Sequence, residues 1–288
     1  MDSNRFVALC VLLMVSIGSG CASPLVTAFE NSQVFQPMEY PQGDWQPDDL
    51  IYEDAFFRAE DGTHLHGWFL PHPQPKAVVL FAHGNAGNLT HRKEMLAELR
   101  ERHDVAVMIF DYRGYGRSRG KPSEQGILQD ARAAREWLSK RTGVDETEIV
   151  LMGRSLGGGV AVDLAAQDGA AGLILINTFN SLVDVAEHHM SWLPTDRMMV
   201  NRLDSLSKID RYQGPLLQTH GDADRVIPFE YGLELFGKAN SPKQFIAVPG
   251  GDHNGPLSEE FHSAMAQFFD SLKISSGFAS LEDSPTTR

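Results

Sequence analysis

The most informative segment of the chain is Val150-Leu-Met-Gly-Arg-Ser-Leu-Gly-Gly-Gly-Val160. An apolar run ends here in the pattern G-x-S-x-G, and small residues continue in a helical pattern as far as Ala166. This order predicts a strand, a sharp turn at Ser155 and a helix. Glycines on both sides of the turn leave room for a strained serine backbone, which presents the hydroxyl to substrate. Ser155 is therefore a candidate nucleophile.

Apolar runs alternate with helical patterns along the rest of the chain. We predict strands at 55–58, 64–70, 77–82, 105–110, 149–152, 172–177, 215–220 and 244–248, and helices at 90–101, from 122, from 160, 228–238 and 258–272. The alternation predicts an α/β fold, with a mostly parallel sheet and helices on both faces. In such sheets the chemistry lies beyond the carboxyl ends of the strands. Polar motifs follow five of these ends: His83-Gly84, Asp111-Tyr112, Ser155, His220-Gly221 and Gly251-Asp252-His253.

The first two predicted strands flank Asp61-Gly62, which is a hairpin turn signal. His64, His66 and Trp68 alternate with apolar residues, so the second strand is expected to have one exposed face. Two histidines on one face could form part of a metal site, but no third ligand is apparent. We interpret them as exposed strand residues and expect no metal.

Residues 178–214 break the alternation and are expected to form a small helical lid. Met190 and Trp192 lie within this stretch. They could line a pocket for an acyl chain or only pack the lid on the core.

A serine hydroxyl needs a base, and the base needs an orienting carboxylate. After Ser155 the chain offers an acid in His220-Gly221-Asp222-Ala223-Asp224 and then His253. The order serine, acid, histidine is that of the α/β hydrolases. Asp222 is an alternative acid nearer the strand end, where such a residue more often caps a loop. His220 is an alternative base, although its place at the strand tip favours a structural role.

These motifs together resemble the α/β-hydrolase superfamily and, more narrowly, its Bem46-like and ABHD-type serine hydrolases. The resemblance covers about residues 50–272, and it rests on 83–88, 111–116, 153–158 and His220-Gly221-x-x-Asp224. It implies an α/β-hydrolase fold with Ser155 as nucleophile, Asp224 as acid and His253 as base. It also implies an oxyanion hole built from the backbone N–H groups of Leu156 and Asn85.

The implied activity is hydrolysis of carboxylic esters or thioesters of acyl or lipid-like compounds, through an acyl-enzyme and without any cofactor. The ABHD-type resemblance points to long acyl chains. Cleavage of lysophospholipids or monoglycerides is an alternative, as is a non-catalytic binding module of the cell envelope. A peptidase is less expected, since the chain has no propeller or large cap domain. Arg113 and Tyr115 could bind an anionic group of the substrate, or could serve ion pairing and loop packing instead.

The N-terminus reads as a targeting segment. Arg5 precedes the apolar run Phe6 to Ile17, and small residues follow up to Cys21, as in a bacterial lipoprotein signal. Gly18 departs from the leucine that such signals prefer, so ordinary cleavage and an uncleaved anchor remain alternatives. We expect acylation of Cys21 and attachment to the periplasmic side of the inner or outer membrane. The expected organisation is a signal peptide at 1–20, a tether at 21–48, a hydrolase domain at 49–273 and a disordered tail at 274–288.

Composition fits one large domain with a sizeable core, because 42% of the 288 residues are hydrophobic. The formal net charge of −13 argues against nucleic acid as a partner. It also gives no attraction to anionic lipids, so membrane attachment would depend on the anchor. Of the two cysteines, Cys10 lies in the signal segment, and no disulfide is expected in the mature chain.

Overall fold

A computed structural model describes residues 24–192 and 194–272. Its eight-stranded sheet has the order β1-β2-β4-β3-β5-β6-β7-β8, and all neighbours pair in parallel except β2, which is antiparallel to both β1 and β4. The strands are β1 (Glu53–Arg58), β2 (His64–Leu70), β3 (Ala77–Ala82), β4 (Val105–Asp111), β5 (Val150–Arg154), β6 (Gly172–Ile176), β7 (Leu216–Gly221) and β8 (Lys243–Val248). The predicted mostly parallel sheet is confirmed.

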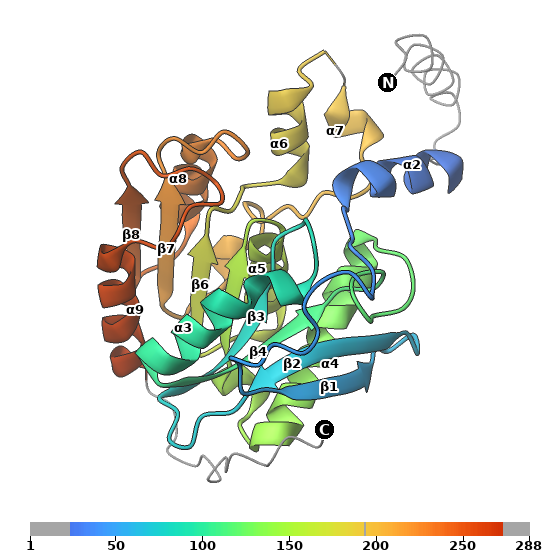
Figure 1. Cartoon of the computed structure of the whole chain (residues 1–288). Helices are drawn as coiled ribbons and strands as arrows, with labels where there is room; N and C mark the ends of the chain where they lie inside the picture. The colour runs from blue at the N-terminus through green and yellow to red at the C-terminus, as the bar shows by residue number, and fades with distance from the viewer. Residues whose placement is uncertain (1–23, 193, 273–288) are drawn as a thin grey trace.

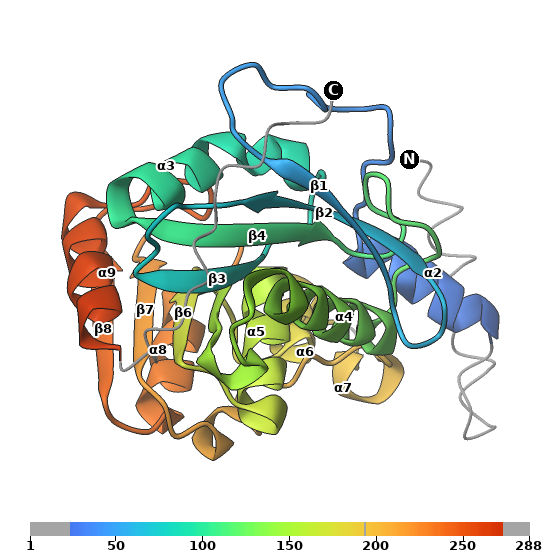
Figure 2. The ribbon, with the colours of Figure 1, turned by 90° about the horizontal axis from the view of Figure 1, so that it is seen from below.

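Helices lie on both faces of the sheet and also beyond the carboxyl ends of its strands (Figures 1 and 2). They are α2 (Pro24–Val34), α3 (Lys93–His103), α4 (Glu124–Thr142), α5 (Leu156–Asp168), α6 (Leu182–His189), α7 (Thr195–Met198), α8 (Phe229–Lys238) and α9 (Glu259–Ser271), with short 3-10 turns η2 (Leu89–Arg92), η3 (Glu146–Glu148) and η4 (Ile209–Arg211). Figure 2 shows α3 and α9 on one face, and α4, α5 and α8 on the other. Each layer packs its own apolar core against the sheet. This is the α/β-hydrolase fold.

Local sequence signals set the ends of α4. The Ser123 side chain accepts a hydrogen bond from the Gly126 amide at the start of this helix, and Gly143 ends it at φ 73°. Serine at the N-cap satisfies an amide that has no partner in the helix, and glycine tolerates positive φ at no steric cost. The predicted start of this helix near residue 122 is confirmed.

The prediction of one exposed face for β2 is wrong. Only His64 is exposed in this strand, and His66 is fully buried, with its Nε2 2.6 Å from Asp54 Oδ1. The reason is that the chain before β1 folds back over the strand. The rings of Trp45 and Tyr52 lie 6.1 and 4.3 Å from that of Trp68. Within 24–192 and 194–272, no cluster of three potential metal ligands occurs.

Residues 24–48 form α2 and a segment that packs onto the domain. Phe35 and Trp45 are buried, and bridges join Pro37 to Gly87 and Glu39 to Gly116. The segment expected as a tether therefore contributes to the folded domain. The predicted signal peptide, Cys21 and the predicted tail at 274–288 lie outside the described residues. No helix in the described part of the chain is long and apolar enough to cross a membrane.

The stretch expected as a lid contains α6, α7 and η4. Figure 1 shows α6 and α7 beyond the carboxyl ends of the strands, beside α2. The Glu30 carboxylate of α2 accepts hydrogen bonds from the amides of Val200 and Asn201, at 2.9 and 2.7 Å. Met190 and Trp192 are 37% and 60% exposed, so neither is packed into the core.

A buried histidine pair joins α3 to α9. His103 Nε2 lies 3.1 Å from His262 Nδ1, and His262 Nε2 lies 3.1 Å from Glu98 Oε1. The neutral tautomers that satisfy both contacts leave His103 Nδ1 unprotonated, buried and without a partner among the described residues. Burial, followed by the nearby His262 ring, lowers the pKa of His103 to about 4.

We predict that this pair makes the protein acid-sensitive. Unfolded His103 takes up a proton near pH 6.5, whereas the folded protein resists until about pH 4. The stability that neutral, buried His103 allows is therefore fully present above pH 6.5, and it is lost as the pH falls towards 4. The free energy of unfolding should drop by about 3 kcal/mol at most over this window, measured by urea denaturation. His103→Leu should flatten the pH profile, whereas His64→Gln, at an exposed site, should not. Equal profiles for wild type and His103→Leu would contradict this account.

Candidate active site

Ser155 lies at the turn between β5 and α5, with φ 54° and ψ −120°. This is a strained conformation for a residue with a side chain, and it is tolerated because the surrounding packing enforces it. A Cβ on Gly157 would lie 1.9 Å from the Ala82 carbonyl oxygen, and one on Gly153 would lie 2.2 Å from the Gly157 carbonyl oxygen. Glycine is therefore required at both positions for the helix to approach the sheet.

His253 and Asp224 converge on Ser155 from the loops that follow β8 and β7. His253 Nε2 lies 3.0 Å from Ser155 Oγ, and His253 Nδ1 lies 2.7 Å from Asp224 Oδ2. A carboxylate accepts, so Nδ1 carries the hydrogen and Nε2 is free to accept the serine proton. The structure thus brings together the three side chains that the sequence proposes as nucleophile, base and acid.

Asp224 is held as a carboxylate. Its side chain is fully buried, and its Oδ1 accepts from the Val226 and Ile227 amides at 2.8 Å each. Burial alone would raise the pKa of Asp224, but hydrogen bonds involving His220, His253 and Ile227 outweigh it and hold that pKa well below its ordinary value. A permanently charged Asp224 would stabilise a protonated His253.

The two alternatives weighed from the sequence occupy other positions. Asp222 Oδ1 accepts from the Gly250 amide at 2.6 Å and so ties two loops together. His220 is buried and its Nε2 donates to the Ile227 carbonyl at 3.0 Å, with Asp224 Oδ2 at 3.3 Å. His220 therefore supports the acid loop rather than facing the serine.

Replacing the two aspartates separates the roles that their contacts indicate. Asp224→Asn should lower kcat by about a thousandfold or more, because the amide favours the wrong histidine tautomer. Asp222→Asn makes the same chemical change two residues away and should keep activity within about threefold of wild type. Both are measured as ester hydrolysis beside thermal melting. Equal losses of activity in two folded variants would contradict the assignment of Asp224.

The loop after β3 lies against the serine. A Cβ on Gly84 would be 3.5 Å from Ser155 Cβ, so the next residue, Asn85, is beside the reaction centre. Leu156 opens α5, and the first amides of a helix have no partner within it. These positions are compatible with the predicted oxyanion hole of the Asn85 and Leu156 N–H groups, which stays a prediction.

The side chain of Asn85 is fully engaged. Its Nδ2 donates to the Val34 carbonyl at 2.6 Å, and its Oδ1 accepts from Tyr115 Oη at 2.8 Å and from the Gln36 amide at 3.0 Å. These contacts fix the loop to the N-terminal segment. Sequence reasoning missed this role, because nothing in the composition of residues 24–48 indicates a partner for Asn85.

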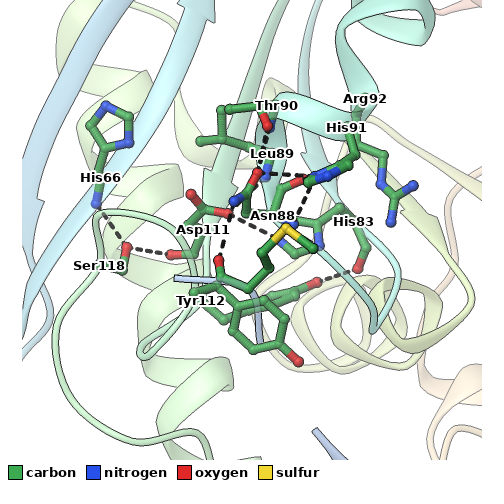
Figure 3. A network of polar contacts seen from close by, with 12 residues as sticks. His66, His83, Asn88, Leu89, Thr90, His91, Arg92, Asp111, Tyr112 and Ser118 are labelled. Carbon is green, nitrogen blue, oxygen red and sulfur yellow. Dashed lines mark hydrogen bonds and ion pairs between the residues drawn. The ribbon is translucent and has the colours of Figure 1, made fainter. Parts of the chain in front are cut away.

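Polar contacts also support this loop from behind (Figure 3). Asp111 Oδ1 accepts from the Leu89 amide at 2.8 Å, and Tyr112 Oη donates to the His83 carbonyl at 2.8 Å. His83 Nδ1 donates to the Gly84 carbonyl at 2.7 Å. His83 therefore shapes the loop, and the motif at Asp111-Tyr112 acts through the same backbone.

The proposal that Arg113 and Tyr115 contact substrate is not supported by their positions. Arg113 is 8% exposed, and its guanidinium pairs with Asp130 and Asp61 at 2.7 Å each. Tyr115 is fully buried against the loop that it supports. Both residues fit the alternative role of ion pairing and loop packing.

Two further residues hold the histidine loop. Asn177 Nδ2 donates to the His253 carbonyl at 2.7 Å, and its Oδ1 accepts from the Gly221 amide at 3.2 Å. Arg154 Nη2 also donates to the His253 carbonyl, at 2.8 Å. The sequence offers one signal for Asn177, since it is a polar residue that directly follows a buried strand.

Removing one hydroxyl tests the support of Asn85. Tyr115→Phe should lower kcat about tenfold with little change in KM, because a looser Asn85 loop weakens oxyanion stabilisation more than substrate binding. Tyr40→Phe, at a 54% exposed ring, is the matched control. Steady-state kinetics on a soluble ester measures both. An unchanged kcat in Tyr115→Phe would remove the hydroxyl from this role.

The fold and the position of Ser155 at its sharpest turn are those of an α/β hydrolase. A family model described as Hydrolase_4, serine aminopeptidase S33, matches residues 73–195. An uncharacterized protein of Mycobacterium tuberculosis is 40% identical over 205 residues, covering 70% of this chain and 73% of that protein. Protein bem46 of Schizosaccharomyces pombe is 31% identical over 279 residues, which cover 87% of this chain and 91% of the length of bem46. The chain belongs to the Bem46-like family of α/β hydrolases.

Solved structures agree with this fold. The esterase Pf2001 of Pyrococcus furiosus superimposes with a TM-score of 0.68 at 21% identity, covering 82% of this chain and 99% of that structure. At this identity the likeness shows the shared fold alone.

Proposed function

We propose that this hydrolase cleaves carboxylic esters or thioesters through a covalent acyl-enzyme on Ser155. The observation that carries the proposal is the continuous line of contacts from Ser155 Oγ through His253 to Asp224, at 3.0 and 2.7 Å. These are hydrogen-bond distances between side chains from three separate loops. A structural serine at a strained turn does not require a histidine that is itself bound to a buried carboxylate, whereas a nucleophile does.

The reaction would proceed in two halves. His253 takes the proton of Ser155 as the serine oxygen attacks the carbonyl carbon, and the N–H groups of Asn85 and Leu156 stabilise the oxyanion. His253 then gives the proton to the leaving alcohol or thiol, and the acyl group stays on the serine. In the second half His253 takes a proton from water, which attacks the acyl-enzyme, and the proton returns to Ser155 as the acid is released. No cofactor enters this scheme.

An aminopeptidase is the activity that the description of the family model suggests. Such an enzyme must bind the free ammonium group of a peptide, which favours carboxylates at the site. Here Arg154 adjoins Ser155, and Asp224 is already engaged with His253. This favours esters over peptides. Monoglycerides and lysophospholipids are alternatives within the ester class, and a non-catalytic binding module is the alternative outside it.

Hydrolysis of a p-nitrophenyl ester series from acetate to palmitate tests the proposal. The wild type should turn over at least part of the series, Ser155→Ala should lose about a thousandfold or more, and a fluorophosphonate should label Ser155 alone. Aminoacyl p-nitroanilides in the same assay test the peptidase alternative. A folded wild type that neither hydrolyses any ester nor reacts with the fluorophosphonate would exclude a serine hydrolase and favour a binding module.

We also propose that the mature protein is anchored to the bacterial envelope through an acylated Cys21. The support is the sequence pattern from Arg5 to Ala22, which lies outside the described residues. Mass spectrometry of the mature N-terminus measures this directly. A diacylglyceryl-modified N-terminal cysteine is expected in the wild type and not in Cys21→Ser, and an unmodified start at another residue would exclude the anchor.

A further inference from the structure

Two arginines are bound to the backbone segments that carry the proposed catalytic groups. Arg92 Nη2 donates to the carbonyl of Ala86 at 2.8 Å, next to Asn85. Arg154 Nη2 donates to the carbonyls of His253 and Gly255, at 2.8 and 3.1 Å. Both side chains remain partly exposed to solvent.

Neither guanidinium is paired directly with a carboxylate among the described residues. Within residues 24–192 and 194–272, no carboxylate forms an ion pair with Arg92 or Arg154, and Arg92 Nε is buried without a partner. Other half-buried arginines in this chain do pair with acids, as Arg141 does with Glu53 at 2.7 Å. The lack of an ion pair at Arg92 and Arg154 is notable because acidic residues outnumber basic residues in this chain, 38 to 25.

The two arginines are bound to neighbouring parts of the site. Arg154 directly precedes Ser155, and a Cβ on Gly84, two residues before the Ala86 carbonyl that Arg92 binds, would lie 3.5 Å from Ser155 Cβ. Burial lowers the pKa of Arg154, and the positive charge of Arg92 lowers it further. Burial also lowers the pKa of Arg92. Figure 3 shows the Arg92 guanidinium extending away from the Asp111 carboxylate. Asp111 and Asp224 oppose these shifts in the pKa of Arg92 and Arg154, respectively, but neither carboxylate forms an ion pair with them. Two partly desolvated like charges without an ion-pair partner remain unfavourable, and an anion placed between them would relieve the repulsion.

Their position selects one side of the substrate. In the proposed reaction His253 protonates the leaving oxygen, so the leaving group lies on the His253 side of the serine. Arg154 is bound to the backbone of that same histidine, and Arg92 to the loop that carries Asn85. A group that contacts both guanidinium groups would therefore belong to the leaving alcohol.

We propose that Arg92 and Arg154 form a subsite for an anionic group, a phosphate or a carboxylate, on the leaving alcohol of the ester. The subsite rests on the proposed ester hydrolysis and specifies its substrate class as acyl esters of anionic alcohols. Guanidinium groups bind both anions with paired, charge-assisted hydrogen bonds. Because the protein as a whole is strongly negative, a local pair of cations is needed to hold such a substrate.

Matched pairs of short-chain esters test the subsite on the full-length protein. Butyrylglycerol phosphate is compared with butyrylglycerol, and butyryloxybenzoate with butyryloxybenzamide, so that only the charge of the leaving alcohol differs. The ratio of kcat/KM for the anionic to the neutral member should be about ten or more in at least one pair. The first pair reports a phosphate and the second a carboxylate.

The variants should lower that ratio and not merely the overall rate. Arg92→Gln should reduce the ratio of kcat/KM about tenfold through a higher KM for the anionic ester. Arg92→Lys should give a ratio between those of Arg92→Gln and the wild type. Arg154→Gln should act in the same direction. Arg211→Gln is the control, because it also removes one positive charge. Arg211 lies in η4, just before the amino end of β7 and so away from the carboxyl ends of the strands, and its replacement should leave the ratio unchanged.

A ratio near one in both pairs, or a ratio that neither Arg92→Gln nor Arg154→Gln changes, would overturn the subsite while ester hydrolysis by Ser155 stands. Binding of inorganic phosphate, followed as a rise in melting temperature, is independent of turnover. If no ester is hydrolysed, a phosphate-dependent rise that is lost in Arg92→Gln would still support the subsite. Equal melting curves with and without phosphate would then reject it.

Discussion

The contact between Gly157 and the end of β3 is the constraint on which the site depends. Helix α5 approaches so closely that even a methyl group at residue 157 would collide with the Ala82 carbonyl. This approach fixes the start of α5, the strained backbone of Ser155 and the loop from His83 to Asn85 relative to one another. Backbone geometry therefore places the proposed nucleophile and both proposed oxyanion donors before any side chain contributes.

The remaining groups reach the serine through loops that brace each other. The acid loop and the histidine loop are joined by Asn177, which bonds to Gly221 in one and to His253 in the other. Asp222 makes a second link through the Gly250 amide. These links hold Asp224 and His253 together through main-chain partners. The lid also contacts the acid loop, since His189 Nε2 donates to the Val226 carbonyl at 2.8 Å, and it connects to α2 through Glu30.

Much of this arrangement could be predicted because it follows from local rules. The strand at 77–82 has the predicted bounds, and apolar runs followed by polar motifs correctly indicated which loops meet at one edge of the sheet. The sequence also proposed Ser155, Asp224 and His253 as a set, and they lie within hydrogen-bond distance. Chain order narrowed the candidates because parallel strands align their carboxyl ends, and the resemblance to the α/β hydrolases then selected Asp224 and His253 over Asp222 and His220.

What could not be predicted depends on contacts between distant segments. His66 follows the alternation of an exposed face, yet it is buried because Trp45 and Tyr52 cover that face. The residues around them are rich in proline, glutamine and aspartate, a composition typical of a linker. The hydrogen bonds of the Asn85 side chain to the backbone of Val34 and Gln36 also join distant segments. These partners lie about fifty positions away, so they leave no local pattern in the sequence.

The packing of Val34 and Gln36 against Asn85 has a consequence for how the protein is used. If Cys21 carries the proposed lipid, then about a dozen residues separate the membrane from Val34, which binds the side chain of the proposed oxyanion donor Asn85. Attachment and catalysis then share one stretch of chain. A protease that cuts between Val34 and Gln36 would release the enzyme and also remove the Val34 contact to Asn85, so release and loss of a support of the proposed active site would be a single event.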